Sequence, residues 1–391
     1  MTWIDLGILI IKCIVLSLAA TTIFAYFTLF ERRTLARLQN RVGPNRAGPG
    51  GFLQPIADAV KLFFKEDVTP LLADRWVYLV SPAFALIPAI IIWATIPVGM
   101  WPDGQGGNWL QLAEINVGVL YLLAVTSVGV YGIAIAGWAS NNKYSMLGGI
   151  RASAQVISYE LALGLTVLGA VMQTQSFSTA EIVERQMQMW NIVPQFLGFV
   201  VFIIAATAEV VRAPFDLVEA EQELVGGYNT EYSSMKFALF FMSEYVKLVA
   251  MNAIAVTLFL GGWQFPGLQA LTQFTTQQYG AMIGNAVLGL TSLGAFLLKV
   301  LLLSFVSVWI RATLPRVRYD QLMNLGWKVL LPLALINVAI TAVVNVLLPN
   351  SPTIAALIGL VAGIIVLAVA AIIGRPGKEK RTVTLVEIGA S

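Results

Sequence analysis

Carboxylates are concentrated in one stretch of a chain that has few charged residues. Only 12% of the 391 residues are charged, yet the stretch from Glu209 to Tyr232 carries six of the 21 Asp and Glu residues. Because crowded carboxylates repel one another, their protonation would respond to a nearby charge or a bound ligand. A docking face for a basic partner protein would explain the same clustering. Both interpretations depend mainly on Asp216, Glu219, Glu221 and Glu223.

Further ionisable residues lie within or at the edge of long apolar runs. A charge at a helix centre costs ~2.5–3.5 kcal/mol on insertion scales, so each one indicates a function or a partner. At a rise of ~1.5 Å per residue, Glu209, Glu244 and Glu160 lie about 5, 12 and 14 Å from the basic flank of their runs. Lys247 and Lys299 lie about 16 and 18 Å deep by the same rise. These depths predict acids at successive levels of the membrane, with lysines beside the deepest of them near mid-membrane. Such an arrangement is typical of a proton path.

Simpler explanations exist for some of these charges. Glu244 and Lys247 are three residues apart, so they would share one helix face and could pair with each other. Lys12 lies near the outer end of the first apolar run, where its long side chain would reach the membrane surface. The proton-path interpretation is therefore strongest at Glu160 and Glu244, and both explanations stay open at Glu209.

The apolar runs that carry these residues predict an all-α polytopic membrane protein. Stretches close to the ~20 residues needed to cross ~30 Å of hydrocarbon recur along the chain. Hydrophobic residues make up 58% of the sequence, and no domain boundary or internal repeat is evident, so residues 1–391 are expected to form a single transmembrane domain. We predict about nine transmembrane helices, at 4–30, 77–99, 116–138, 153–172, 192–211, 236–260, 283–310, 329–348 and 353–373.

The distribution of basic residues predicts which side of the membrane each connection lies on. Alternate connections hold 19 of the 24 Lys and Arg residues, whereas the other connections hold only Arg185. Because positive charge marks the cytoplasmic side, we predict an external N-terminus and a cytoplasmic C-terminus. The first run lacks the basic leader and cleavage site of a signal peptide, so it is predicted to be a retained span. The predicted cytoplasmic segments are 31–76, 139–152, 212–235, 311–328 and the tail 374–391.

The first cytoplasmic loop, 31–76, contains a predicted amphipathic helix at about 51–65. Apolar side chains recur there at helical spacing, while Asp58, Lys61 and Lys65 occupy the remaining surface. Such a helix would either lie in the membrane interface or pack on the ends of the spans. Both alternatives place it at the membrane surface.

Composition excludes several kinds of site. The chain has one cysteine and no histidine, so it cannot assemble a Cys₄, Cys/His or bis-His set for zinc, haem or an iron–sulfur cluster. A net charge of +3, distributed beside the spans, argues against nucleic-acid binding. Arginines can bind carboxylates through paired hydrogen bonds, although topology and lipid contact explain part of the basic residues. The candidates for such contacts are Arg41, Arg46, Arg311, Arg316 and Arg318.

Four long segments occur together in the order found in one known family. They are ERRTLARLQNRVGPNRAGPGGFLQPIADAVKLFFKED, RASAQVISYE, AEVVRAPFDLVEAEQELVGGYNTEYSSMKFALFFMSEY and RATLPRVRYDQLMNLGWK, and they cover about a third of the chain. By these segments the chain closely resembles the H-subunit family of bacterial NADH:quinone oxidoreductase, which is the complex I subunit 1 family. The family usually has eight spans, so the run at 353–373 would be an additional helix.

The resemblance implies a membrane subunit at the junction between an electron-transfer arm and a proton-pumping arm. It would form the membrane end of a quinone-binding chamber and couple quinone reduction to proton translocation in the bacterial cytoplasmic (inner) membrane. Quinone would be the substrate, and this chain would bind no cofactor alone, because FMN and iron–sulfur clusters belong to partner subunits. The expected partners are the peripheral-arm subunits of the quinone site, antiporter-like and small membrane-arm subunits, and membrane lipid.

Family residues carry over to the positions of this chain that match the family's motifs. The buried acids that lead away from the chamber match Glu160, Glu209 and Glu244, and we add Lys247 and Lys299 to this path. Some members have a further Glu in the third span where this chain has Ser127, so that position would be filled by Ser127 with water or by another residue. The acidic coupling loop matches Asp216, Glu219, Glu221 and Glu223. The chamber matches Glu31, Arg32, Asp58, Ala59 and Lys61, with Phe240 and Phe241 as weaker matches.

Other functions fit parts of the pattern. The related membrane subunit of membrane-bound hydrogenases shares this ancestry, but the intact RVGPNRAGPGGFLQP and ELVGGYNTEYSS segments favour the quinone enzyme. A stand-alone ion transporter would use the buried acids and lysines as its ion site, yet the repeats common in such proteins are not visible. A purely structural anchor would explain the acidic loop and leave Glu160 and Glu244 unexplained.

Overall fold

The computed structural model describes residues 3–102, 107–216, 225–349 and 351–373. Helices account for the regular structure in these ranges, and no β-strand is found among them. Eight helical stretches in the same ranges are long and apolar enough to cross a membrane. The prediction of an all-α polytopic membrane protein is therefore confirmed.

The predicted spans correspond to nine helices of the structure. Several helices run beyond their predicted ends, because polar turns of helix continue out of the apolar segment. The nine helices are α1 (Trp3–Leu38), α3 (Arg75–Ile91), α4 (Gly118–Ala139), α5 (Lys143–Thr174), α7 (Phe196–Glu209), α9 (Ser234–Phe259), α11 (Ala281–Thr313), α13 (Leu331–Leu347) and α14 (Pro352–Ile373).

Helix α7 is shorter than the predicted span at 192–211. Its 14 residues form an apolar helix that falls outside the set long enough to span. At ~1.5 Å per residue it measures about 21 Å, against ~30 Å of hydrocarbon. The chain before it turns and is tied to the end of α9, where the Ile192 N–H donates to the Phe259 carbonyl over 2.8 Å. Irregular backbone is tolerated at membrane depth because it is buried in protein.

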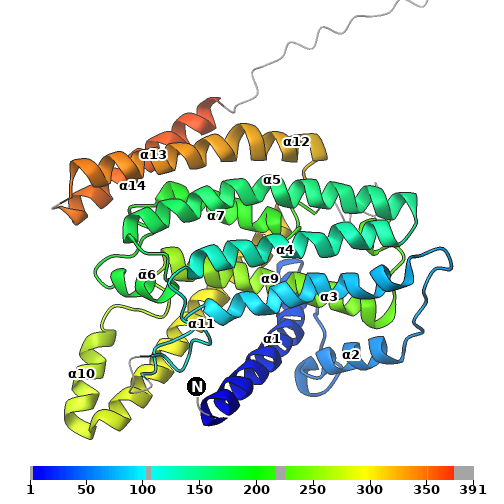
Figure 1. The fold of residues 1–391 in the computed structure, drawn as a ribbon, viewed down its shortest axis with the longest axis horizontal. Helices are drawn as coiled ribbons and strands as arrows, with labels where there is room; N and C mark the ends of the chain where they lie inside the picture. The colour runs from blue at the N-terminus through cyan, green and yellow to red at the C-terminus, as the bar shows by residue number, and fades with distance from the viewer. Residues whose placement is uncertain (1–2, 103–106, 217–224, 350, 374–391) are drawn as a thin grey trace, which may run out of the picture.

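The helices form a bundle in which α5 and α9 are central (Figure 1). Helix α5 contacts α4, α7 and α13, and α9 contacts α3, α11 and α1. Two glycines allow close approach of the backbones. A Cβ at Gly132 would lie 2.5 Å from the backbone nitrogen of Ala85, and one at Gly148 would lie 2.7 Å from the Cα of Gly227. The second contact fixes the segment after the acidic loop against α5.

Helix α9 is the core of the bundle. All residues from Leu248 to Phe259 are buried, so this half of the helix is covered on all sides, as expected of a helix that is apolar all round. Its first half, from Ser234 to Lys247, carries the charged residues of the helix and leads out of the acidic loop. A rigid core segment therefore positions Glu244 and Lys247.

Shorter helices lie at the two ends of the bundle (Figure 1). The basic end comprises residues 39–74, 140–142, 210–216, 225–233 and 314–318, and it includes α2 (Gln54–Phe64) and the one-turn 3₁₀ helix Gly227–Asn229. Helix α12 (Tyr319–Asn324) follows, and a π-helical segment, Leu325–Leu330, joins it to α13. The opposite end carries α6 (Thr179–Arg185) and α10 (Leu268–Tyr279), which lie within two of the connections between predicted spans.

Helix α2 is the predicted amphipathic helix. It packs against α1 and α9, yet Phe63 and Phe64 remain 68% and 81% exposed. Ile56 and Val60 are also exposed on it. The helix thus touches the ends of the spans and still presents an apolar face, which we expect to lie in the membrane interface.

Candidate functional site

Four charged side chains meet inside the bundle near its basic end, and we call them the arginine–glutamate cluster: Glu31, Arg212, Glu244 and Arg311. Arg212 Nη1 lies 3.2 Å from both carboxylate oxygens of Glu31. Arg212 Nε pairs with Glu244, and Arg311 pairs with Glu31. Glu31 and Arg212 are only 3% and 7% exposed. Four separate segments therefore bring two acids and two arginines into one buried group.

Local sequence explains how Arg212 comes to face inward. Helix α7 ends at Glu209, and Pro214 prevents it from continuing. The Phe215 N–H then donates to the Arg212 carbonyl over 2.8 Å, which closes a turn. The guanidinium lies over the ring of Tyr245, 3.9 Å from its centroid. Burial alone would lower the pKa of Arg212, but the carboxylates of Glu244 and Glu31 raise it above its ordinary value, so this side chain stays charged.

Two further contacts continue from the cluster toward the middle of the bundle. Lys247 Nζ lies 3.0 Å from Oε1 of Glu209, which is 1% exposed. Glu160 on α5 accepts a hydrogen bond from the hydroxyl of Ser127 on α4 and interacts electrostatically with Glu209 and Lys247. Lys247 thus pairs with the acid of α7 rather than with Glu244 of its own helix. The acids that the sequence placed on one path lie next to one another.

Two small cavities border these charges. The first, of about 30 Å³, is lined by Glu31, Arg212 and Arg311 together with residues of α7, α9 and α11. The second, of about 40 Å³, is lined by Glu209, Glu244 and Lys247 among others. Each has room for at least one water molecule, which needs a cavity of ~10–15 Å³ or more. Water could therefore reach the charged groups on both sides of the Arg212–Glu244 pair.

The predicted chamber residues separate into two groups. Arg32 Nη1 lies 2.7 Å from Asp58 Oδ2 and joins α1 to α2, with Lys61 Nζ at 3.9 Å from the same carboxylate. Glu31 faces the interior instead. Ala59 is exposed on α2 near this pair.

The two phenylalanines are packed into the core on different sides of α9. Phe240 is 1% exposed and packs against the rings of Tyr228 and Tyr232, whereas Phe241 packs against Phe24 and Tyr245. The structure therefore does not bring Phe240 to the surface beside α2.

The acidic loop is anchored at its start. Asp216 is 4% exposed and lies 3.2 Å from Arg316 Nη2. The Val317 N–H donates to the Pro214 carbonyl over 3.1 Å, so residues 314–318 clasp the segment that leaves α7. Gln155 Nε2 donates to the carbonyls of Ala208 and Phe215, over 2.7 and 2.9 Å. The other predicted loop carboxylates, Glu219, Glu221 and Glu223, lie outside the described residues.

The remaining predicted arginines lie at the surface of the basic end. Arg41 Nε donates to Gln39 Oε1 over 2.7 Å, a local contact within the loop after α1. Arg46 and Arg318 are exposed. Among the five predicted contacts, only Arg311 and Arg316 therefore reach a carboxylate in the described residues.

Comparison with known proteins decides the family. The model of the NADH dehydrogenase family matches residues 11–342. The chain belongs to the NADH dehydrogenase family. It is 46% identical over 339 residues to the first of two H subunits of NADH-quinone oxidoreductase from Geobacter metallireducens, covering 86% of this chain and 96% of that protein. It is 50% identical over 343 residues to the H subunit from Deinococcus deserti, covering 87% and 84%.

A third relative in the NADH dehydrogenase family gives the same picture. The H subunit of NADH-quinone oxidoreductase from Rhodospirillum rubrum is 47% identical over 336 residues, which cover 86% of this chain and 93% of that protein. The arginine–glutamate cluster lies within the family match, because all its members fall between residues 11 and 342. Helix α14 lies beyond the match.

Two lysines of this NADH dehydrogenase family chain lie apart from the acids. Lys299 Nζ donates to the carbonyls of Leu260, Gly262 and Gln264, over 2.7, 3.0 and 2.5 Å, and lies 4.3 Å from the Trp190 ring centroid. Lys12 lies over the Trp109 ring at 4.7 Å. Both hold connections at the opposite end, so the structure does not bring Lys299 to the acids of the predicted path.

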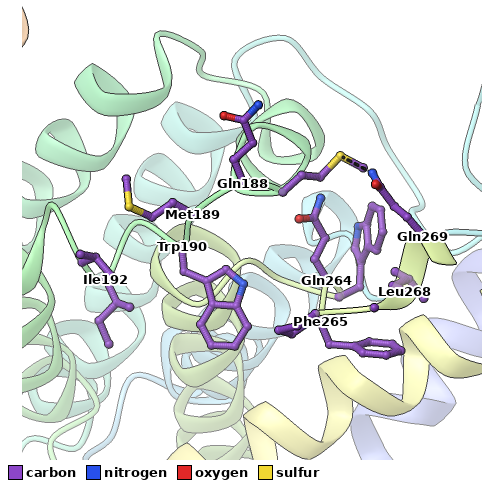
Figure 2. A pocket seen from close by; sticks show the side chains of 13 residues that line it. Gln188, Met189, Trp190, Ile192, Gln264, Phe265, Leu268 and Gln269 are labelled. Carbon is purple, nitrogen blue, oxygen red and sulfur yellow. Dashed lines mark hydrogen bonds between the residues drawn. The ribbon is translucent and has the colours of Figure 1, made fainter. Parts of the chain in front are cut away.

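A hollow on the same side of the bundle as Lys299 has a different chemistry (Figure 2). Its volume is about 420 Å³, and its lining contains no Asp, Glu, Lys or Arg. Gln269 Nε2 lies 3.4 Å from the sulfur of Met187. Figure 2 shows Trp190 and Phe265 below Gln269. Among the described residues, no group of three or more His, Cys, Asp and Glu side chains is placed to hold a metal ion. The charged chemistry therefore lies at the basic end.

Arg212 is the functional candidate that sequence reasoning missed. It is the one basic residue in the stretch Glu209 to Tyr232, and this isolation was the available signal. Its partner Glu31 is 181 residues away in the chain. No local pattern joins positions so far apart, so the pairing required the fold.

Proposed function

We propose that this chain is the membrane subunit of a proton-translocating NADH:quinone oxidoreductase, or complex I. In this role it forms the membrane end of the quinone-binding chamber and couples quinone reduction to proton translocation. The observation that supports this best is the succession of partnered acids toward the middle of the bundle. Glu31 and Glu244 share Arg212, Glu209 pairs with Lys247 beside the cavity that Glu244 also lines, and Glu160 bonds with Ser127. Its relatives, which are named as H subunits of that enzyme, support the same assignment.

The chamber lies where the end of α1, helix α2 and the start of α9 meet. A quinone has an apolar tail and a head whose carbonyl oxygens accept hydrogen bonds. The exposed apolar face of α2 suits the tail, and the cations Arg32 and Lys61 beside Asp58 suit the polar head. Glu31, the neighbour of Arg32 in the chain, connects this surface to the buried cluster.

Coupling in this proposal is electrostatic. Electrons from NADH reach the quinone through FMN and iron–sulfur clusters of partner subunits, and this chain acts without a redox centre of its own. Reduction of the quinone changes the charge beside Glu31 and alters which of the linked acids carry protons. Glu244, Glu209 and Glu160, with Lys247 and Ser127, then pass the change toward antiporter-like membrane subunits.

The location and partners follow from the same assignment. The chain lies in the bacterial cytoplasmic membrane with its basic end toward the cytoplasm, its N-terminus external and its C-terminus internal. The acidic loop, including Asp216, Glu219, Glu221 and Glu223, faces the peripheral arm and responds to the charge of the quinone. Arg41, Arg46 and Arg318 extend the same surface toward peripheral-arm subunits and lipid headgroups.

The test is purification of the native complex through a tag on this chain. We expect co-purification of FMN-containing and iron–sulfur subunits, and NADH oxidation that depends on added quinone and pumps protons after reconstitution. A complex that evolves hydrogen would instead assign the chain to a membrane-bound hydrogenase. A single chain that exchanges ions in vesicles would assign it to a transporter, and either outcome would overturn the proposal.

A further inference from the structure

Arg212 occupies the boundary between the two small cavities of the basic end. The first cavity is lined by Arg212 with Glu31 and Arg311, and the second by Glu244 with Glu209 and Lys247. Val210 lines both of them. The Arg212–Glu244 pair therefore forms part of the wall between the cavities, and a proton that crosses this part of the wall passes a fixed positive charge.

The guanidinium is held by partners on several elements. Glu31 of α1 and Glu244 of α9 are its ion-pair partners, and Arg311 of α11 shares Glu31 with it. Tyr245 of α9 supports its flat face at 3.9 Å. Arg212 Nη2 is buried and has no hydrogen-bond partner among the described residues, so part of the group remains available to a water molecule.

The two carboxylates share one cation. Arg212 pairs with both Glu31 and Glu244, and Arg311 is a second arginine that pairs with Glu31. If Arg212 turns fully toward Glu31, Glu244 faces the second cavity without that charge beside it. A buried carboxylate from which a cation moves away favours the protonated form more strongly, because the ionised form is poorly solvated there.

We propose that Arg212 is an electrostatic gate between the cavities, and that its choice between Glu31 and Glu244 decides whether Glu244 can take up a proton. While Arg212 bridges both acids, the gate is closed and Glu244 stays ionised. A negative charge that develops at the membrane surface near Arg32 or Arg311 draws Arg212 away from Glu244. A proton that enters from the surface and is relayed through water in the first cavity then binds the Glu244 carboxylate. The return of Arg212 expels this proton into the second cavity, where the Glu209 carboxylate accepts it. This inference rests on the proposed proton path and adds its point of control.

The test uses the whole complex reconstituted into vesicles, with Arg212→Gln as the main variant. Protons pumped per NADH oxidised and the stimulation of NADH oxidation by an uncoupler are measured. We expect Arg212→Gln to lower the pumping ratio at least about threefold and to abolish uncoupler stimulation, whatever the remaining rate of NADH oxidation. Arg185→Gln, which removes an exposed arginine on α6, is the matched control and should leave both quantities unchanged.

Two further variants keep the proposal testable if Arg212→Gln does not assemble. Arg212→Lys keeps the charge but loses the fork that spans two carboxylates, and Tyr245→Leu removes the ring that supports the guanidinium. Both should lower the pumping ratio. An unchanged ratio in every assembled variant overturns the gate. If the wild-type complex itself fails to pump, the proposed function fails, so the two failures are distinguishable.

Discussion

The buried charges of the basic end are arranged in pairs that share neighbours. Glu31 is held by two arginines, Glu244 by Arg212 and Glu209 by Lys247. Breaking such a pair by removing one partner leaves an uncompensated charge and typically costs ~3–5 kcal/mol. Substitutions that remove charge but keep shape are therefore the informative ones, since they separate proton transfer from folding.

At this scale we predict that Glu244→Gln leaves the complex assembled and lowers its pumping. Glutamine matches the size of the side chain but cannot carry a proton, so we expect coupled quinone reduction to fall about tenfold, equivalent to ~1.4 kcal/mol in the barrier. The measurement is proton uptake and NADH oxidation in vesicles. Glu181→Gln, at an exposed acid of α6, should be neutral, and unchanged pumping in Glu244→Gln would exclude this acid from the path.

The sequence identified the acids of this site but not their partners. A carboxylate in an apolar run is conspicuous because inserting a charge into the membrane costs free energy. Glu160 and Glu244 could therefore be predicted as functional candidates from that cost alone. The pairing of Glu209 with Lys247 was not predictable, because Glu244 was an equally good partner on the same helix. Estimating depth from the number of residues along a helix placed Lys299 near the acids. In the structure, backbone carbonyls rather than carboxylates accept its hydrogen bonds.

Helix α2 is tied to the first turn of α9 by side chains that follow the acidic loop. The Ser234 hydroxyl lies 2.9 Å from the carbonyls of Leu62 and Lys65, at the end of α2. The Val68 N–H donates to the Ser233 hydroxyl over 3.0 Å, and Lys236 pairs with Asp67 at 3.1 Å. These contacts satisfy groups that a helix end otherwise leaves without partners. The position of α2 is thereby fixed relative to the helix that carries Glu244.

Ser234 also adopts a backbone conformation that L side chains disfavour, with φ of 54°. Such strain costs ~1–3 kcal/mol. We predict that Ser234→Ala destabilises the protein by about 1–3 kcal/mol, because it keeps the strain and loses the hydrogen bond that the single hydroxyl proton shares between two carbonyls. Ser234→Gly should be close to neutral in stability. Glycine adopts this φ without strain, and the relief of strain offsets the loss of the hydroxyl contact. Thermal unfolding of the purified complex distinguishes the two.

The same pair of variants tests the link to α2. Both lose the hydroxyl, so both should increase hydrogen exchange in residues 54–66, whatever their effect on overall stability. Thr275→Ala on α10 is the control, since its hydroxyl bonds only within its own helix, to Leu271 and Thr272. Unchanged exchange in α2 for both serine variants would show that Ser234 does not hold this helix.

At the scale of elements, long apolar runs were enough to place the spans, because lipid leaves the backbone few alternatives to helix. The length of α7 was not predictable, since residues 192–194 are apolar in sequence but turn in the structure. Their non-helical path depends on Phe259 and Leu258, which accept hydrogen bonds from Ile192 and Asn191 across the bundle. Helices α6 and α10 were missed because both are short and rich in polar residues.

The whole molecule separates charged from neutral polar chemistry along the bundle. Ion pairs occupy the basic end, whereas amide and hydroxyl side chains hold the other half together. Gln195 Nε2 donates to Thr341 over 2.6 Å, Asn337 Nδ2 donates to Gln195 over 2.7 Å, and Gln186 Nε2 donates to the Thr257 carbonyl over 2.9 Å. Neutral hydrogen bonds do not change with pH, whereas Glu31, Glu209 and Glu244, the buried acids that form ion pairs, lie toward the basic end.

This asymmetry predicts the orientation of the molecule in its membrane. Connections at the basic end hold most of the basic residues, which remain on the cytoplasmic side during insertion. The orientation can be read with single cysteines in a Cys13→Ser background. Leu71→Cys, fully exposed between α2 and α3, reports the basic end, and Gln278→Cys on α10 reports the opposite end.

A membrane-impermeant maleimide should label Gln278→Cys in intact spheroplasts and leave Leu71→Cys unlabelled. Inside-out vesicles should give the reverse, because the same two positions exchange their access to the reagent. Detergent lysis is the control that makes both positions reactive. Labelling of Leu71→Cys in intact spheroplasts would place the arginine–glutamate cluster at the external surface. Protons from the cytoplasm could then no longer reach Glu31 from the basic end, and the proposed direction of coupling would be excluded along with the orientation.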